Sequence, residues 1–283
     1  MNSISFPHSG RARAVIERVT PEVEGGDFPI KRTLGEEVLV EADIYTDGHD
    51  QLSCLLLHRP TGTGKWSEIA MMHTNNDCWQ ASFNVTGLGR HEYTVIAWVD
   101  RFLTWRHDIA RREEEADILA ALKVGIALVT DAAKRAEASA ALALDNWAAE
   151  LNAATTPQAR QLMAQSESLA DLMATYAERL YVTEYHRVLA VTVEVERARF
   201  SAWYEIFPRS CLTEGATHGS FAGVIAQLPD IAAMGFDVLY LPPIHPIGRS
   251  FRKGPNNTLK AGPDDHGSPW AIGAATGGHK AIL

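Results

Sequence analysis

Residues 203–241, WYEIFPRSCLTEGATHGSFAGVIAQLPDIAAMGFDVLYL, decide the fold of the C-terminal third of the chain. An aromatic and aliphatic run that stops at Pro208 predicts a short strand. Ser220 can cap the helix that follows, and Gly235 ends it. The apolar run at 238–241 does not alternate with polar residues, which is typical of a strand buried on both faces of a parallel sheet. We therefore expect the beginning of a parallel α/β sheet.

The loop at 242–272 leaves the carboxyl end of that second strand, where α/β sheets and β/α barrels hold their ligands. Its cationic residues lie within twelve positions of one another and are Arg249, Arg252, Lys253 and Lys260. This concentration of charge in an acidic protein predicts an anion site, with phosphate held by charge-assisted hydrogen bonds. A solvated basic loop without a ligand is the alternative interpretation.

The same loop contains Asp264, Asp265 and His266, which could suggest acid–base catalysis or a metal site. Adjacent residues of an extended loop point apart, however, and the flanking Gly262-Pro263 and Gly267 indicate turns. The histidines of the chain do not have the spacing of metal ligands. The sequence also contains no P-loop, dinucleotide-binding fingerprint or nucleophile elbow. We expect no metal, no cofactor and no catalytic role for this pair of aspartates.

The composition excludes several classes of protein. The 283 residues have room for about two domains of ordinary size. A net charge of −9 without a basic stripe argues against a nucleic-acid partner. No run approaches the ~20 apolar residues of a membrane span, and residues 1–10 contain no signal-peptide core. The three cysteines are isolated in sequence, which is typical of a reducing compartment. We expect a soluble cytoplasmic protein.

Residues 1–110 predict a strand-rich domain. Apolar and polar residues alternate in four runs bounded by turn residues, at 38–44, 52–56, 79–85 and 93–99. Short strands at regular intervals predict an immunoglobulin-like β-sandwich. Trp66, Trp98 and Trp105 could stack on sugar rings, or they could fill the core or pack against a neighbouring domain.

Residues 111–190 predict helices. Glu113, Glu114 and Glu115 favour a helix N-terminus, and Thr156-Pro157 predicts a second start with Thr156 as the N-cap. Two long helices joined by a short turn would form an antiparallel pair. The alternation at 191–196 then predicts a strand that returns to the sandwich, so that the helices form an insert. The Ala-rich helical face is either a dimer interface or an intrachain packing face.

Four motifs together carry a resemblance to a known family: WYEIFPRS at 203–210, LPDIAAMGFDVLYLPPIHPIG at 228–248, RKGPNNT at 252–258 and GSPWAIG at 267–273. They closely resemble the bacterial α-1,4-glucan:maltose-1-phosphate maltosyltransferases, a branch of the α-amylase family of glycoside hydrolase 13 type. The resemblance covers essentially the whole chain. It implies an N-terminal β-sandwich domain at 1–110, a helical insert used in dimerisation at 111–190, and a return strand with the start of a (β/α)8 barrel at 191–283.

The resemblance also implies an activity. Members of this family transfer maltosyl from α-maltose 1-phosphate to the non-reducing end of an α-1,4-glucan, with retention of configuration and release of phosphate. The lysine of the Arg-Lys-Gly motif, here Lys253, contributes to their maltose 1-phosphate site. Asn256 and Asn257 match the motif as well, and could support the loop through side-chain to backbone hydrogen bonds. The resemblance implies a homodimer.

The chain departs from the family in its length. A complete barrel needs ~250 residues, whereas 83 residues follow Phe200. Retaining chemistry needs two carboxylates about 5–5.5 Å apart, and the family carries its nucleophile and acid/base on later strands. We therefore assign no catalytic residue in this chain.

We expect the N-terminal part of the enzyme, from a truncated reading frame or an incomplete gene model, and no activity from this part alone. One alternative is a non-catalytic glucan-binding or dimerisation module. Another is a fragment of a different α-amylase-family enzyme, in which Lys253 would meet no phosphate.

Overall fold

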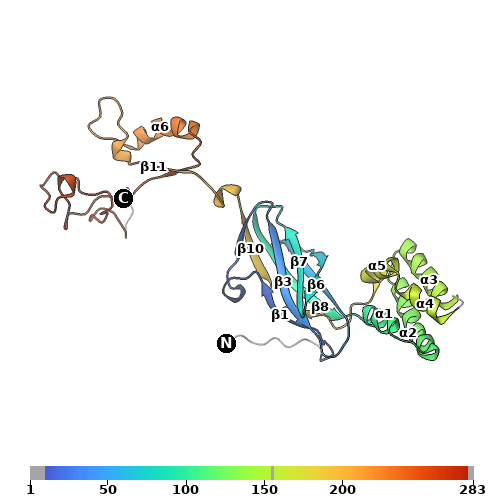
Figure 1. Ribbon diagram of the computed structural model, residues 1–283. Coiled ribbons are helices and arrows are strands. Elements are labelled where there is room, and N and C mark those ends of the chain that lie inside the picture. Colours follow the sequence, from blue (N-terminus) through green and yellow to red (C-terminus); the bar gives the residue numbers. More distant parts are fainter. Residues whose placement is uncertain (1–9, 154–155, 280–283) are drawn as a thin grey trace. The chain divides into compact units, whose positions relative to one another are not determined.

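The computed structural model describes residues 10–153 and 156–279 (Figure 1). The chain divides into two compact units, Met1–Val195 and Glu196–Leu283, and each is described by itself. The expectation that residues 1–10 contain no signal-peptide core concerns a segment of which residues 1–9 lie outside the described residues.

Two β-sheets form the strand-rich part of the first unit. The four-stranded sheet has the order β1 (Val15–Thr20), β3 (Glu37–Tyr45), β7 (Cys78–Asn84) and β6 (Met72–Asn75). The six-stranded sheet has the order β2 (Ile30–Thr33), β10 (Leu189–Glu194), β8 (Gly89–Val99), β4 (Leu52–Pro60) and β5 (Ser67–Ala70), with β9 (Thr183–Glu184) paired to β8. Neighbouring strands are antiparallel except β10 and β2, which are parallel.

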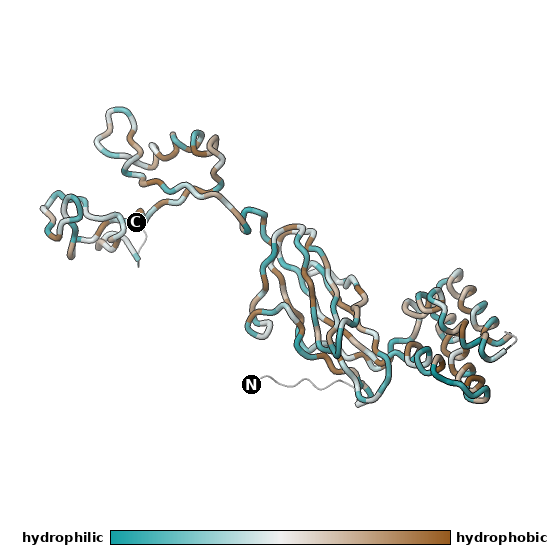
Figure 2. Tube along the Cα trace, viewed as in Figure 1, coloured by the Kyte–Doolittle hydropathy of each residue, from teal (hydrophilic) through white to brown (hydrophobic). Residues whose placement is uncertain are grey.

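The two sheets share one hydrophobic core. The alternation that predicts β3 places Val38, Val40 and Ala42 in this core with no exposed surface. Tyr93 and Val95 of β8 enter the same core from the other sheet. The four predicted strands are therefore confirmed, whereas β1, β2, β5, β6 and β9 were not predicted. Figure 2 shows the alternation of apolar and polar residues along these strands.

The predicted return strand is β10, which pairs antiparallel with β8 and parallel with β2. This strand belongs to the first compact unit. The helices lie in sequence between β8 and the short strand β9, and both flanking strands belong to the same sheet. The helical segment is therefore inserted between two strands of one sheet.

In the described part of that insert there are five helices, and they share a second hydrophobic core. They are α1 (Arg101–Ala110), α2 (Glu115–Ala133), α3 (Ala138–Ala153), α4 (Pro157–Ala164) and α5 (Glu167–Tyr176). The prediction of two long helices is therefore wrong, because the chain breaks at 134–137 and again at 165–166. The predicted cap is confirmed, since the hydroxyl of Thr156 accepts a hydrogen bond from Ala159 N at 3.1 Å.

The sequence did not predict α1. Its N-cap is Asp100, whose carboxylate accepts hydrogen bonds from Phe102 N and Leu103 N at 2.9 Å each. Trp105 of this helix is buried, as is Trp98 of β8. For these two residues the interpretation as packing side chains is confirmed, and stacking on sugars is wrong. Trp66 is half-buried, with the guanidinium of Arg59 4.0 Å from its ring centre.

The second unit begins with the predicted strand–helix–strand. β11 (Trp203–Glu205) and β12 (Val238–Tyr240) pair in parallel, and α6 (Phe221–Ala233) connects them. The expectation that the second strand is buried on both faces is wrong. Val238 and Leu239 are half-buried and Tyr240 is 39% exposed, because the part of this unit that the structure describes offers one partner strand and one α-helix to cover them.

Candidate functional site

The candidate site lies in the loop after β12. Antiparallel bridges join Ile247 to Ile272 and Ala274 to Gly277. A hydrogen bond from Gly248 N to Ala271 O, at 3.0 Å, reinforces the first bridge. The segment between residues 248 and 271 is therefore closed at its neck by backbone contacts, like a large surface loop with its own internal packing.

The side chain of Arg252 holds this loop together. Its Nε donates to Gly248 O and its Nη2 donates to Ile247 O, each at 2.9 Å. Its Nη1 donates to Asp265 O, also at 2.9 Å. Three of the five guanidinium N–H groups therefore bind backbone carbonyls. Of the four cations of the predicted anion site, Arg252 therefore uses its side chain to bind backbone carbonyls of the loop.

Close approach of neighbouring atoms explains why two positions of the loop are glycine. Gly267 has φ +75°, and a Cβ there would lie 2.9 Å from Arg252 Cγ. A Cβ at Gly254 would lie 2.2 Å from Lys260 O. Asp265 adds a turn, because its Oδ2 accepts a hydrogen bond from Gly262 N at 2.6 Å. These contacts give the loop a defined path.

Lys253 lines an open cleft of about 690 Å³ in this loop. The other polar side chains around the cleft are Asn256, Asn257, Asp264, Asp265, His266, Ser268 and Trp270. Lys253 is half-buried, and its ammonium forms no ion pair or hydrogen bond with any residue in 10–153 or 156–279. The cleft thus combines the ammonium of Lys253 with two carboxylates and with amide, imidazole, hydroxyl and aromatic groups.

Asn256 and Asn257 shape the loop through their backbones. Their φ values are +52° and +62°, in the left-handed region that Asn tolerates better than most residues. Thr258 N donates to Pro255 O at 3.2 Å and Gly254 N donates to Thr258 O at 2.9 Å, which closes a tight turn around them. In the described loop their side chains form no hydrogen bond to the backbone, so the amides are available to the cleft.

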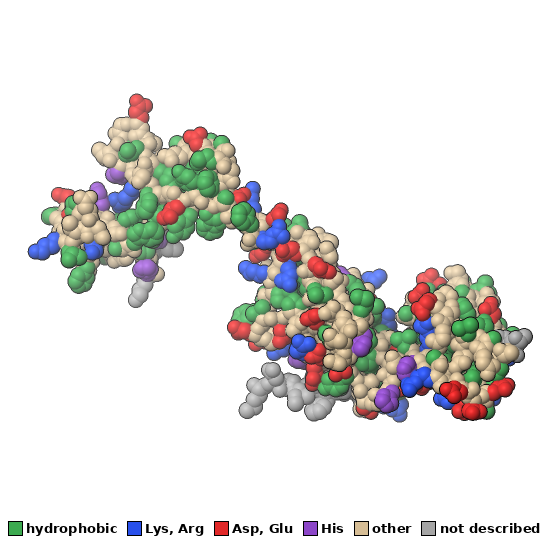
Figure 3. Space-filling view, in the orientation of Figure 1, with side chains coloured by type: hydrophobic (Ala, Val, Ile, Leu, Met, Phe, Trp, Pro, Cys, Tyr) green, Lys and Arg blue, Asp and Glu red, His purple; other side chains and the backbone are tan. Residues whose placement is uncertain are grey.

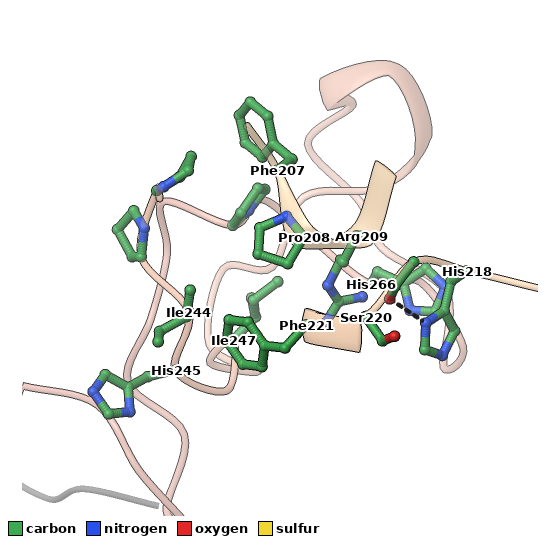
Figure 4. A pocket seen from close by; sticks show the side chains of 14 residues that line it. Phe207, Pro208, Arg209, His218, Ser220, Phe221, Ile244, His245, Ile247 and His266 are labelled. Atoms are coloured by element: carbon green, nitrogen blue, oxygen red, sulfur yellow. Dashed lines mark hydrogen bonds between the residues drawn. The ribbon is translucent and has the colours of Figure 1, made fainter. Parts of the chain in front are cut away.

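A second pocket in this unit has a volume of about 460 Å³ (Figure 4). Its lining comes from the segments that follow β11 and β12, and His266 lines both cavities. Gly219 N donates to Arg209 O at 2.7 Å and closes the segment after β11. In Figure 4, His245 lies at the opposite end of the pocket from His218. The carboxyl ends of two parallel strands therefore meet at one cavity, as in α/β ligand sites.

Three residues that line this pocket were not identified as site residues from the sequence: Arg209, His218 and Phe221. The signal that could have indicated them is their position: all three follow the carboxyl end of the first strand, just as the Lys253 loop follows the second. An edge-on contact between Phe207 and Trp270, with ring centres 6.2 Å apart, links the two segments.

Comparison with known proteins gives the family. The family model described as "Alpha-1,4-glucan:maltose-1-phosphate maltosyltransferase, domain N/S" matches residues 12–197. The chain belongs to this family. The match covers both hydrophobic cores of the first unit, and ends just after β10.

Relatives named alpha-1,4-glucan:maltose-1-phosphate maltosyltransferase extend the similarity into the second unit. The protein from Chlorobaculum tepidum is 46% identical over 277 residues, which cover 98% of this chain and 41% of the relative. The protein from Methylacidiphilum infernorum is 42% identical over 279 residues, 98% of this chain and 41% of the relative. Because almost all of the chain is aligned, the Lys253 loop falls within the similarity. The chain spans about 41% of the length of these maltosyltransferases.

The described residues contain neither a cluster of metal-binding side chains nor a helix that could span a membrane. No three or more His, Cys, Asp or Glu side chains between residues 10 and 279, apart from the undescribed 154–155, lie where they could jointly hold a metal ion. None of the helices in the described ranges has the length and apolar content needed to cross a bilayer.

Proposed function

We propose that this chain supplies the N-terminal domains and part of the donor site of a retaining maltosyltransferase. The enzyme would transfer maltosyl from α-maltose 1-phosphate to the non-reducing end of an α-1,4-glucan and release phosphate. The observation that carries the proposal is the uncommitted ammonium of Lys253 in a cleft at the carboxyl end of β12. The names of the relatives specify this donor and this type of acceptor for those proteins.

The cleft has the chemistry that the donor requires. Lys253 offers a point charge to the phosphate, and such charge-assisted hydrogen bonds are about twice as strong as neutral ones. When the bond between the sugar and the phosphate breaks, negative charge grows on the leaving phosphate, and a fixed cation stabilises that charge. Asn256, Asn257 and Ser268 offer hydrogen bonds to sugar hydroxyls, and Trp270 offers an aromatic face. A volume of about 690 Å³ is in the usual range for small-molecule sites.

Exposed apolar side chains of the second unit favour a barrel fold for the catalytic domain of the complete enzyme. Figure 3 shows hydrophobic side chains gathered over the part of this unit that holds α6 and β11. Phe221, Ile225 and Leu228 of α6 are exposed, as are Trp203 and Tyr240 of the two strands. Exposed apolar side chains that gather in one patch favour a surface that another element or partner covers. Further strands and helices of a (β/α)8 barrel would cover it, and we propose that β11 and β12 are the first two barrel strands.

Features of the first unit favour a sandwich fold, a homodimer and a location in the cytoplasm. Its two sheets around one core suit an immunoglobulin-like sandwich. Leu142 of α3 and Leu162 of α4 are 64% and 76% exposed, and we propose that the helical insert uses such residues in a homodimer. The three cysteines are free thiols, as expected in a reducing compartment, and we place the protein in the cytoplasm.

Two carboxylates are needed for retention of configuration, and we assign neither role to a residue of this chain. The purified 283-residue chain should therefore bind donor without transferring maltosyl. The test is a titration of the ¹⁵N-labelled chain with α-maltose 1-phosphate, with maltose and glycogen as matched ligands. Saturable changes in the 248–271 amide signals at much lower concentrations of the phosphate ester than of maltose support the proposal. Glycogen binding without phosphate-ester binding would favour a glucan-binding module instead.

A further inference from the structure

Arg252 and Lys253 are neighbours in sequence but have different partners in the structure. The guanidinium of Arg252 binds the carbonyls of Ile247 and Gly248 at one end of the loop and the carbonyl of Asp265 at the other, all at 2.9 Å. The segment between these two ends carries Lys253, Asn256 and Asn257. One side chain therefore closes the segment that forms most of the cleft wall.

This contact requires arginine in particular. A planar guanidinium with five donors can bind three carbonyls that converge from different directions, whereas a lysine ammonium on its flexible stem cannot span them at once. The chain also makes room for the stem of Arg252, since Gly267 has φ +75° and a Cβ there would lie 2.9 Å from Arg252 Cγ. The loop is thus built around this side chain.

We propose that Arg252 is a positioning residue for the donor phosphate. It does not itself bind the phosphate. Its three hydrogen bonds hold the loop so that the ammonium of Lys253 faces the cleft before the ligand arrives. Ordering the loop in advance removes part of the entropic cost of binding, and so raises affinity without a new contact. This inference rests on the proposed function, because it takes the Lys253 cleft as the phosphate site.

A direct electrostatic role for Arg252 makes a different prediction. If its guanidinium attracted the phosphate independently, removing it would weaken binding whether or not Lys253 were present. If it acts through Lys253, its removal has no effect once Lys253 is gone. A double-mutant cycle separates the two roles, because only residues that act together deviate from additivity.

The experiment uses the 283-residue chain with inorganic phosphate and α-maltose 1-phosphate as probes, and measures Kd by NMR titration. The variants are Arg252→Gln, Arg252→Lys, Lys253→Ala and the Arg252→Gln/Lys253→Ala double variant. We expect Arg252→Gln to raise Kd about tenfold, or about 1.4 kcal/mol, and to add nothing in the Lys253→Ala background. Arg252→Lys keeps the charge and should weaken binding as much as Arg252→Gln. Additive losses, or an Arg252→Lys chain that binds like the parent, would overturn the inference.

Two further variants separate the position of the Arg252 side chain from the charge of the loop. Gly267→Ala displaces the Arg252 stem without changing any charge, and should reproduce the tenfold loss. Arg249→Gln removes an exposed cation of the same loop that does not line the cleft, and should change Kd by less than about twofold. Amide signals of the first unit should be the same in every variant.

The same data separate failure of this inference from failure of the proposed function. If the parent chain does not bind either probe, or Lys253→Ala binds both as well as the parent, the phosphate site itself is wrong and the inference falls with it. If Lys253→Ala loses binding but Arg252→Gln does not, only the positioning role of Arg252 is wrong.

Discussion

The side chain of Arg252 crosses Gly267 so closely that a Cβ at Gly267 would lie 2.9 Å from Arg252 Cγ. Gly267 also has φ +75°, a conformation that strains any residue with a Cβ. We predict that Gly267→Ala opens the loop at 248–265 and speeds amide hydrogen exchange there. Gly262→Ala is the matched control, because its Cβ would have ordinary contact with Asp265 Oδ2 at 3.4 Å. Equal rates of amide exchange in the two variants would contradict the proposal that Arg252 holds the loop in place.

A second glycine determines how two helices of the insert pack. A Cβ at Gly125 of α2 would lie 1.9 Å from Cζ2 of Trp105 in α1. The indole Nε1 of Trp105 also donates to Ala121 O at 2.7 Å. We predict that Gly125→Ala costs about 1–3 kcal/mol of unfolding free energy, because overpacking displaces the indole. Urea unfolding followed by far-UV circular dichroism measures the change.

The control for that variant is Gly64→Ala. Gly64 lies in a turn after β4, and no heavy atom lies within 4 Å of its Cβ position. Its unfolding midpoint should match that of the parent chain within error. A Gly125→Ala chain with the same midpoint as this control would show that α1 and α2 do not pack through Gly125.

The cap of α1 gives a third prediction. Asp100 is buried, and its carboxylate accepts hydrogen bonds from two backbone N–H groups of α1 and from Ser53 Oγ at 2.7 Å. Asp100→Ala should cost about 2 kcal/mol, because it removes the cap and leaves buried donors unpaired. Thermal unfolding measures the loss. Asp100→Asn keeps a capping oxygen and should retain most of the stability, so an equal loss in both variants would argue against capping as the cause.

The stability of the two-sheet part of the first unit should depend on pH through His58. Its ring stacks on Phe83 with ring centres 4.4 Å apart, and burial lowers the pKa of His58, with a smaller contribution from the charge of His91. Because the folded state favours the neutral ring, its contribution is present above the unfolded pKa of about 6.5 and is lost as pH falls toward the folded pKa. The melting temperature should drop between pH 7 and 5. A His58→Gln chain with the same pH slope would show that another group is responsible.

Much of the fold could be predicted from local patterns. Alternation indicated β3 and β8 because each places one face in the core, and Thr156-Pro157 indicated a helix start because the cap is a local interaction. The α1 helix was missed because its cap, Asp100, directly follows a strand pattern that continues to Val99. The break between α2 and α3 was missed because an Ala-rich run favours helix throughout.

The candidate site was predicted only in part. Lys253 was identified from its charge, its place after an apolar strand and the family motif. The role of Arg252 could not be predicted, because a cation that binds backbone carbonyls looks the same in sequence as one that binds a ligand. The position of Arg209 and His218 after β11 could have indicated the edge of the sheet on which they lie. That they line one pocket with His266 could not be predicted, since it depends on how two loops fold together.

The central claim is that Lys253 binds the phosphate of the donor. The most direct test is the ratio of the dissociation constants of the 283-residue chain for α-maltose 1-phosphate and for maltose, with and without Lys253→Ala. We expect the substitution to raise the Kd for the phosphate ester by about ten- to a hundredfold, as expected for one charged hydrogen bond. The Kd for maltose should stay within about twofold. Equal losses for both ligands, or no loss for either, would contradict the claim.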